Sequence, residues 1–117
     1  MVDKYIVDGK VAVLVSPGYG AGWYTWHRDE RMLYDPNIVK ILLESPPIDD
    51  PDLNVDRMFE VGNKIESYCK EAYPGVYVGG AVGLYVEWVP VGEQFRISEY
   101  DGSETLIRAS AQIWITA

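Results

Sequence analysis

The sequence has little of what disulfide-rich, zinc-binding and membrane-spanning proteins need. It contains one cysteine, Cys69, and one histidine, His27. A single cysteine excludes an intramolecular disulfide framework and a zinc site built from several thiolates. No apolar run approaches the roughly 18 residues of a transmembrane helix, and no signal peptide is recognisable. We therefore expect a cytoplasmic protein without membrane segments.

Basic residues are also scarce. The chain has 10 Lys and Arg against 18 Asp and Glu, which gives a formal net charge of −8. Such a surface repels a phosphate backbone at long range, so we do not expect duplex nucleic acid as a partner. A small phosphorylated ligand remains compatible where a few arginines converge on it. The acidity also suits a partner with a basic surface.

The length and composition fit one domain over residues 1–117. A chain of 117 residues with 48% hydrophobic residues is long enough to bury one modest core. Its 9 Tyr and 4 Trp are numerous for this length. These side chains pack broadly and keep a polar group, so they favour interfaces and ligand pockets as well as cores.

The N-terminal residues predict a β-hairpin. Residues 4–7 and 10–15 are rich in strand-forming residues, and Asp8-Gly9 between them is a strong two-residue turn signal. Residues 11–15 (VAVLV) are continuously apolar. This run predicts a strand that is buried on both faces.

Two helices are expected next. Asp35-Pro36 is typical of a helix start, so we predict a helix over residues 36–44 that Ser45-Pro46-Pro47 ends. An acidic loop follows, and a second helix is predicted from Asn54 to residue 73, before Pro74-Gly75. Its apolar stripe consists of Met58, Phe59, Ile65, Cys69 and Ala72.

The C-terminal third predicts strands over residues 76–78, 84–89, 94–100 and 105–108, with residues 112–116 as a candidate to close the sheet. Asp101-Gly102 is a second hairpin signal. The expected fold is therefore α+β. It has an antiparallel β-sheet of about five to six strands, and two helices inserted after the N-terminal hairpin pack on one face of that sheet.

The residue types for catalysis or metal binding lack a suitable pattern. A Cys–His pair would need Cys69, which lies on the apolar stripe of the second helix and is expected to pack as a small hydrophobe. His27 with Asp29 and Glu30 has no metal-ligand spacing. The aspartates of residues 49–52 read as a solvated loop rather than a calcium site. We expect no enzyme, no metal and no cofactor.

Residues 17–27 (PGYGAGWYTWH) combine glycines with aromatic side chains after the apolar strand. They lack the Gly-Lys-Ser/Thr ending and the dinucleotide-binding fingerprint that phosphate-binding loops carry. The glycines instead allow movement, or the close approach of another strand, a subunit or a ligand. We predict a flexible turn that leads into a short strand or a wide loop.

These aromatic rings suggest a nucleotide site. A ring that stacks on a nucleobase contributes roughly 1–3 kcal/mol, and Arg28 and Arg31 follow closely enough to pair with phosphates. The alternative is that the rings fill the end of the sheet and the arginines offset acidic neighbours. The candidate ligand-binding residues are Trp23, Tyr24, Trp26, His27, Arg28, Arg57 and Arg108.

Residues 11–26, 32–44 and 83–104 together resemble small proteins encoded by bacteriophages and prophages, with a Gly-Ala-Gly-Trp core at residues 20–23. Among these, the chain is similar to the first Thoeris anti-defence family. That resemblance implies an oligomeric, non-enzymatic sponge. It would sequester glycocyclic ADP-ribose signals made by TIR-domain enzymes, and some members also bind cyclic oligonucleotides.

The leading hypothesis is therefore a phage-derived, homo-oligomeric protein that captures a nucleotide immune signal and so blocks host defence. Two alternatives stay open. One is an acidic phage protein that inhibits a host defence protein by binding to it directly, and the other is a virion or assembly accessory protein.

Overall fold

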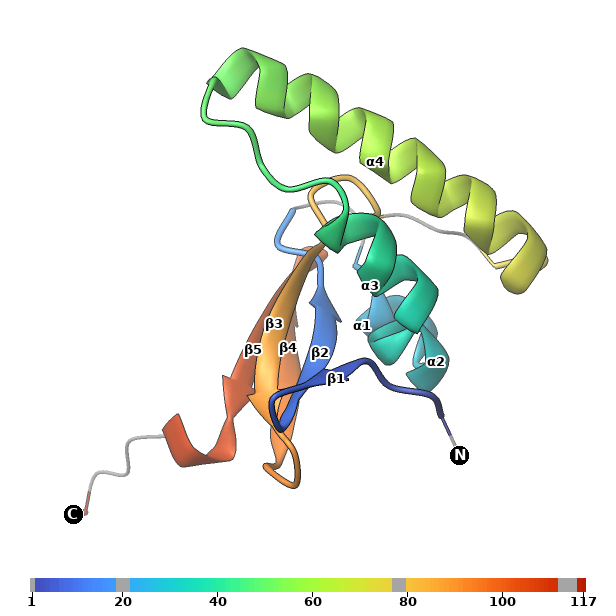
Figure 1. The fold of residues 1–117 in the computed structure, drawn as a ribbon. Helices are drawn as coiled ribbons and strands as arrows, with labels where there is room; N and C mark the ends of the chain where they lie inside the picture. The colour runs from blue at the N-terminus through green and yellow to red at the C-terminus, as the bar shows by residue number, and fades with distance from the viewer. Residues whose placement is uncertain (1, 19–21, 77–79, 112–115) are drawn as a thin grey trace.

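The computed structural model describes residues 2–18, 22–76, 80–111 and 116–117 of the chain. Within these residues the fold is α+β, as the sequence predicted (Figure 1). The first elements are the strands β1 (Ile6–Val7) and β2 (Lys10–Val15) and the helices α1 (Tyr24–His27), α2 (Glu30–Tyr34), α3 (Pro36–Leu43) and α4 (Pro51–Ala72). The strands β3 (Tyr85–Pro90), β4 (Phe95–Tyr100) and β5 (Ser103–Arg108) follow, and a 3-10 turn covers Ala109–Ala111.

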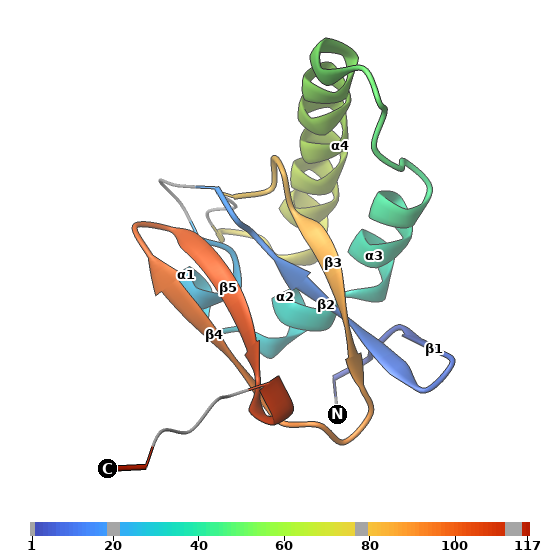
Figure 2. The ribbon, with the colours of Figure 1, turned by 90° about the vertical axis from the view of Figure 1, so that its left-hand side faces the viewer.

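The five described strands are divided between two sheets instead of forming one. The first is antiparallel in the order β1-β2-β3, and the second is the β4–β5 hairpin. The chain turns after β3 with Gly92 at a φ of +88°. The hairpin then lies beside the first sheet (Figure 2), and its Leu106, Phe95 and Ile97 pack against the apolar side chains of β2. The second sheet is therefore joined to the first mostly by side-chain packing, and not by a continuous ladder of backbone hydrogen bonds.

Both hairpin signals are confirmed. Asp8 and Gly9 have φ values of 51° and 75°, and Asp101 and Gly102 have φ values of 50° and 86°. Positive φ at both central positions is what a two-residue type I′ turn requires. These local signals fix the β1–β2 and β4–β5 pairings.

The two predicted helices are present, but the second begins earlier than expected. In α3, the Asp35 carboxylate accepts hydrogen bonds from the N–H groups of Asn37 and Ile38. In α4, Asp50 is the N-cap and Pro51 is the first helical residue, so the predicted start at Asn54 is wrong. Asp50-Pro51 repeats the Asp-Pro signature of α3, although the surrounding acidic residues suggested a loop.

Two short helices replace the turn or strand expected after the glycine-rich segment. α1 begins directly after Trp23, and α2 is capped by Asp29, whose side chain accepts from the N–H of Arg31. The described residues therefore place four α-helices, not two, between β2 and β3.

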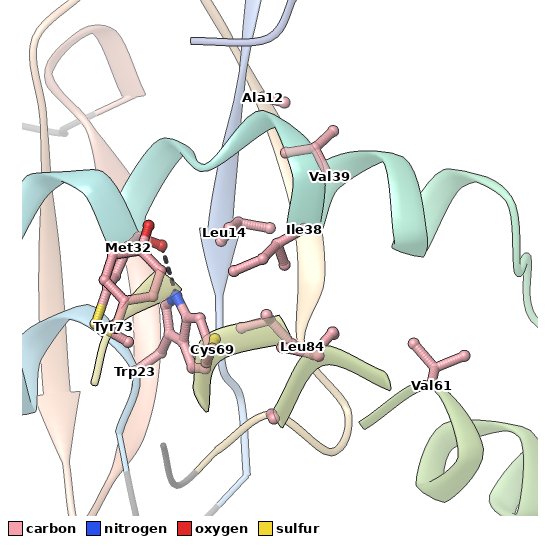
Figure 3. Close-up of a cluster of buried hydrophobic side chains, with 12 residues drawn as sticks. Ala12, Leu14, Trp23, Met32, Ile38, Val39, Val61, Cys69, Tyr73 and Leu84 are labelled. Atoms are coloured by element: carbon pink, nitrogen blue, oxygen red, sulfur yellow. Dashed lines mark hydrogen bonds between the residues drawn. The ribbon is translucent and has the colours of Figure 1, made fainter. Parts of the chain in front are cut away.

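The prediction that residues 11–15 are buried on both faces is confirmed. Ala12 and Leu14 face a cluster built mostly from the helices, including Ile38 of α3 (Figure 3). Ile65 of α4 belongs to the same cluster. On the other face, Val13 and its alternate neighbours contact the β4–β5 hairpin. Strand β2 is thus the centre of the molecule, and α3 and α4 share one of its faces.

Two predicted strands, residues 76–78 and 112–116, lie mostly outside the described residues, which include only residue 76 of the first and residue 116 of the second. Within the described part of the chain, no helix is long and apolar enough to span a membrane.

Candidate functional site

The structure places the predicted ligand-binding residues in four separate regions: the core, the surface around α1, the end of β5 and a groove beside α4. Trp23 lies in the core with no exposed surface, and its indole N–H donates to the Met32 carbonyl at 2.6 Å (Figure 3). A ring that is covered on both faces cannot stack on a nucleobase. Trp23 is therefore a core residue, and its prediction as a ligand platform is corrected.

The other candidates of this segment lie on or next to α1. Tyr24 is half-buried and packs against both core clusters. Trp26 is 48% exposed, and its indole N–H lies 3.5 Å from the Glu99 carboxylate. Arg28 ends α1 in a left-handed conformation and is exposed. The side chain of His27 lies outside the described part of the structure. Among the described side chains, this region presents one exposed ring, Trp26, and one exposed cation, Arg28.

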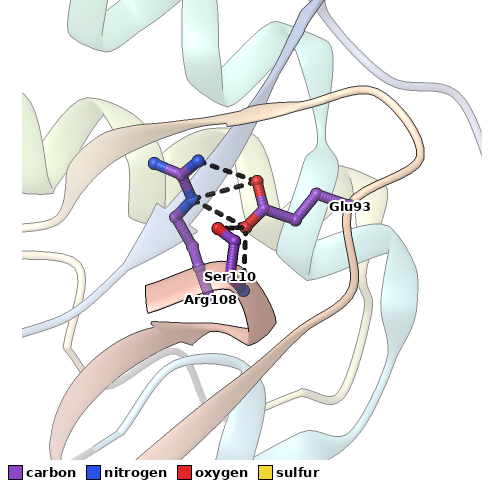
Figure 4. A network of polar contacts seen from close by, with 3 residues as sticks. All are labelled: Glu93, Arg108 and Ser110. Atoms are coloured by element: carbon purple, nitrogen blue, oxygen red, sulfur yellow. Dashed lines mark hydrogen bonds and ion pairs between the residues drawn. The ribbon is translucent and has the colours of Figure 1, made fainter. Parts of the chain in front are cut away.

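Arg108 is held by a carboxylate at the far end of β5. Its guanidinium donates to Glu93 with N–O distances of 2.8 and 3.1 Å, and Glu93 also accepts from the backbone and hydroxyl of Ser110 (Figure 4). The hydrogen bonds from Arg108, and then those from Ser110, lower the pKa of Glu93 to about 2. A phosphate would have to compete with this carboxylate for Arg108.

Arg57 lines a sizeable cavity. The cavity is a groove of about 380 Å³ between the end of α3, the first half of α4 and strand β3, and we call it the α4 groove. Its lining is Leu42, Leu43, Ser45, Pro47, Asn54, Arg57, Met58, Val61, Ala81, Gly83, Leu84, Tyr85, Val86 and Trp88. The volume is in the range of small-ligand sites, about 300–1,000 Å³.

The α4 groove differs in charge from the rest of the molecule. Arg57 is its only charged residue, because the described lining contains no Asp, Glu, Lys or His. The whole chain, by contrast, carries a net charge of −8. An anion entering the groove would therefore meet a guanidinium without a carboxylate among the lining residues.

Two aromatic side chains from β3 border the α4 groove. Tyr85 is 39% exposed, and its hydroxyl donates to Glu87 at 3.2 Å. Burial, and then the nearby Glu87, raises the pKa of Tyr85, so this phenol stays neutral. Trp88 is half-buried, with its ring centroid 6.3 Å from that of Tyr5. Both residues lie on β3, and its pairing with β2 holds their backbone in place.

Two glycines let the segment before β3 approach α4. A Cβ on Gly62 would lie 2.8 Å from a side-chain atom of Val82, so a larger residue in α4 would push this segment away. Gly83 has a φ of +82°, and a Cβ there would lie 3.3 Å from the Met58 methyl. The width of the groove at this end therefore depends on both glycines.

A buried carboxylate on α3 fixes the angle between the two helices. Asp35 caps α3 with one oxygen, and its other oxygen accepts from the hydroxyls of Tyr68 and Tyr73 of α4 and its C-cap at 2.9 and 2.5 Å. Burial, and then the Asp35 carboxylate, raises the pKa of Tyr73, so it remains a donor. Cys69, between the two tyrosines, is buried, and burial raises its pKa to about 11. These contacts hold α4 against α3 and so set the walls of the groove.

A second buried carboxylate organises α1. Glu104 is 2% exposed, and its side chain accepts from the N–H groups of Ser16, Trp23 and Thr25 and from the Thr25 hydroxyl. No buried side-chain polar atom in the described residues lacks a hydrogen-bond partner. Glu104 thus joins the end of β2 to the start of α1 across the glycine-rich segment.

Sequence reasoning missed the α4 groove because its walls come from three separated segments. The available signals were the alternation of residues 84–88, which places Leu84, Val86 and Trp88 on one face, and Arg57 on the polar side of the predicted helix. Neither signal shows that β3 lies next to the first half of α4.

No family model, curated protein or solved structure matches this chain significantly. Within the described residues, no group of three or more His, Cys, Asp or Glu side chains is arranged to hold a metal ion.

Proposed function

We propose that this chain is a non-enzymatic binding protein that captures a nucleotide immune signal in the α4 groove. The observation that carries the proposal is the composition of the groove. It combines one arginine with two aromatic rings, and its described lining has no carboxylate although the chain is strongly acidic. This is the local charge that a phosphorylated ligand needs.

In this proposal the base packs against Trp88 or Tyr85, and the phosphates face Arg57. Base–aromatic stacking contributes roughly 1–3 kcal/mol. An arginine can bind a phosphate with two parallel hydrogen bonds. The only hydrogen bond that Arg57 makes to the described residues is a long one, 3.5 Å to the Pro46 carbonyl. Its remaining donors are therefore free to bind a phosphate.

Capture is reversible and leaves the ligand unchanged. The apolar lining of the α4 groove, which includes Leu42, Met58 and Leu84, removes water from around a bound ligand. The Arg57–phosphate contact is stronger in such surroundings than in bulk water. Tight binding with slow release is sufficient to lower the concentration of a signal.

The biological setting follows from the resemblance of residues 11–26, 32–44 and 83–104 to phage proteins. The chain would act in the cytoplasm of an infected bacterium, on glycocyclic ADP-ribose or a cyclic oligonucleotide. Self-association fits this role, because a second subunit would enclose a ligand that a chain of this size covers only in part.

Titration calorimetry with glycocyclic ADP-ribose and cyclic ADP-ribose isomers tests the proposal. We expect nanomolar binding, and we expect the ligand to be recovered intact after the complex is heated. Failure of all of these nucleotides to bind would contradict the proposal, and recovery of a converted product would make the protein an enzyme.

A specific feature of α4 favours the alternative of a direct protein inhibitor. The first half of the helix exposes Leu53, Val55 and Phe59 by 55%, 50% and 56%, and Asp52 and Asp56 lie among them. An acidic helix with exposed apolar side chains fits an apolar cleft with a basic rim. A Leu53→Ser, Phe59→Ser variant that still captures the nucleotide but no longer blocks host defence would establish this second function.

A further inference from the structure

Strand β3 has one paired edge and one open edge. In the ladder with β2, the Val91 N–H donates to the Gly9 carbonyl at 2.9 Å. Antiparallel strands alternate between hydrogen-bonded and non-hydrogen-bonded pairs, so alternate residues of β3 bond to β2. The backbone N–H and C=O groups of Val86 and Trp88 therefore point away from β2. Among the residues that the structure describes, no strand pairs with this edge.

The neighbouring strand supports this assignment. Ala12 of β2 lies opposite Trp88, so the same alternation requires the N–H of Ala12 to point away from β3. This N–H donates to the Tyr5 carbonyl, on the β1 side, at 2.9 Å. Pro90, which has no N–H, occupies the next outward-pointing position on β3. The usable open edge is therefore the short segment around Val86 and Trp88.

The α4 groove reaches this open edge near the start of β3. Tyr85 and Val86 are adjacent on the strand, and both line the groove. Adjacent side chains of a strand point to opposite faces, and the other edge of β3 is paired with β2. A cavity that touches both side chains therefore extends round the open edge. The opposite wall is α4, with Met58 and Arg57. In Figure 2, α3 lies to the right of β3, and α4 lies above the upper end of the strand.

A strand edge beside a helix is an arrangement that binds extended peptides. The peptide adds a strand through backbone hydrogen bonds, and every second side chain enters the groove between strand and helix. The floor of the α4 groove is apolar, with Leu42, Met58 and Leu84. Arg57, without a carboxylate among the described lining residues, selects a negative group on the peptide.

We propose that the open edge of β3 and the adjoining α4 groove bind an extended peptide that carries a carboxylate and alternating apolar side chains. The peptide pairs with the backbone of Val86 and Trp88, its apolar side chains occupy the groove, and its carboxylate binds Arg57. This inference does not rest on nucleotide capture. If the groove binds both ligands, the shared use of Arg57 makes them mutually exclusive.

The test begins with a displayed library of random heptapeptides with free C-termini. The most enriched peptide is synthesised, together with versions that are N-methylated at one amide at a time, and binding is measured by fluorescence anisotropy. Methylation blocks strand pairing only where the amide faces β3. We expect losses of at least tenfold that alternate along the peptide, and we expect the Val86 and Trp88 amide protons to shift and become protected from exchange.

The Arg57→Gln substitution is expected to weaken binding of the peptide at least tenfold. Circular dichroism checks that the variant is folded. Arg96→Gln, an exposed arginine on β4, is the matched control and is expected to bind normally. The absence of any enriched peptide, or an enriched peptide that tolerates every single N-methylation, would overturn the proposal. Nucleotide binding is measured separately, so failure of one proposal does not imply failure of the other.

Discussion

Ser16 and Glu104 bond to each other in both directions. The backbone N–H of Glu104 donates to the Ser16 carbonyl at 2.7 Å, and the Ser16 N–H donates to the Glu104 carboxylate at 3.1 Å. The second carboxylate oxygen accepts from Trp23 and Thr25 at the start of α1. One buried side chain therefore fixes the end of β2, the start of β5 and the position of α1.

Glu104→Gln is expected to destabilise the fold. A glutamine can offer its carbonyl to Trp23 and Thr25, but its NH₂ group then faces the Ser16 N–H. A buried donor without an acceptor costs about 1–3 kcal/mol, so the free energy of unfolding in urea should fall by that amount. Glu99→Gln is the matched control, because Glu99 is exposed and lies on the same hairpin. Equal stability of the two variants would contradict this role of Glu104.

Trp23 and Trp26 should respond differently to the same substitution. Trp23→Phe removes the indole N–H that satisfies the Met32 carbonyl and leaves unfilled volume in the core. We expect a loss of about 1–3 kcal/mol in the free energy of unfolding. Trp26→Phe, at a side chain 48% exposed, should change it by less than about 0.5 kcal/mol. Chemical denaturation of both variants measures the two changes in the free energy of unfolding. A larger loss for Trp26→Phe than for Trp23→Phe would contradict the assignment of Trp23 to the core and Trp26 to the surface.

The Glu93–Arg108 pair predicts a specific acid response. The pKa of Glu93 is lowered to about 2 from its ordinary 4.5 by the Arg108 and Ser110 hydrogen bonds. A carboxylate whose pKa is lowered on folding stabilises the folded state above its unfolded pKa, and this contribution is lost as the pH falls towards 2. The side-chain carboxyl carbon of Glu93, followed by NMR, should titrate near pH 2. In Arg108→Gln the midpoint should rise towards 4.5, and an unchanged midpoint would exclude Arg108 as the main cause.

The features that the sequence predicted correctly depend on neighbouring residues. The Asp8-Gly9 turn and the Asp35 cap are set by two or three consecutive residues, and the apolar run of β2 predicts its burial directly. The Trp23 prediction failed because the cause of its burial is distant. Its backbone N–H donates to the carboxylate of Glu104, 81 residues further along the chain, and no local pattern reveals that contact.

The α4 groove illustrates the same limit for the candidate site. Arg57 was a candidate from its residue type, but its neighbours Leu42 and Trp88 come from other segments of the chain. Only the packing of α3, α4 and β3 brings them together. The sequence therefore selected the arginine that lines the α4 groove, whereas the rings it selected, on and next to α1, are not among the residues that line it.

The most direct measurement is a calorimetric titration of glycocyclic ADP-ribose into the native protein, Arg57→Gln and the matched control Arg96→Gln. The proposed capture in the α4 groove predicts nanomolar binding to the native protein and to Arg96→Gln. It predicts at least about a tenfold loss for Arg57→Gln, which corresponds to about 1.4 kcal/mol. No binding to the native protein, or undiminished binding to a folded Arg57→Gln variant, would contradict it.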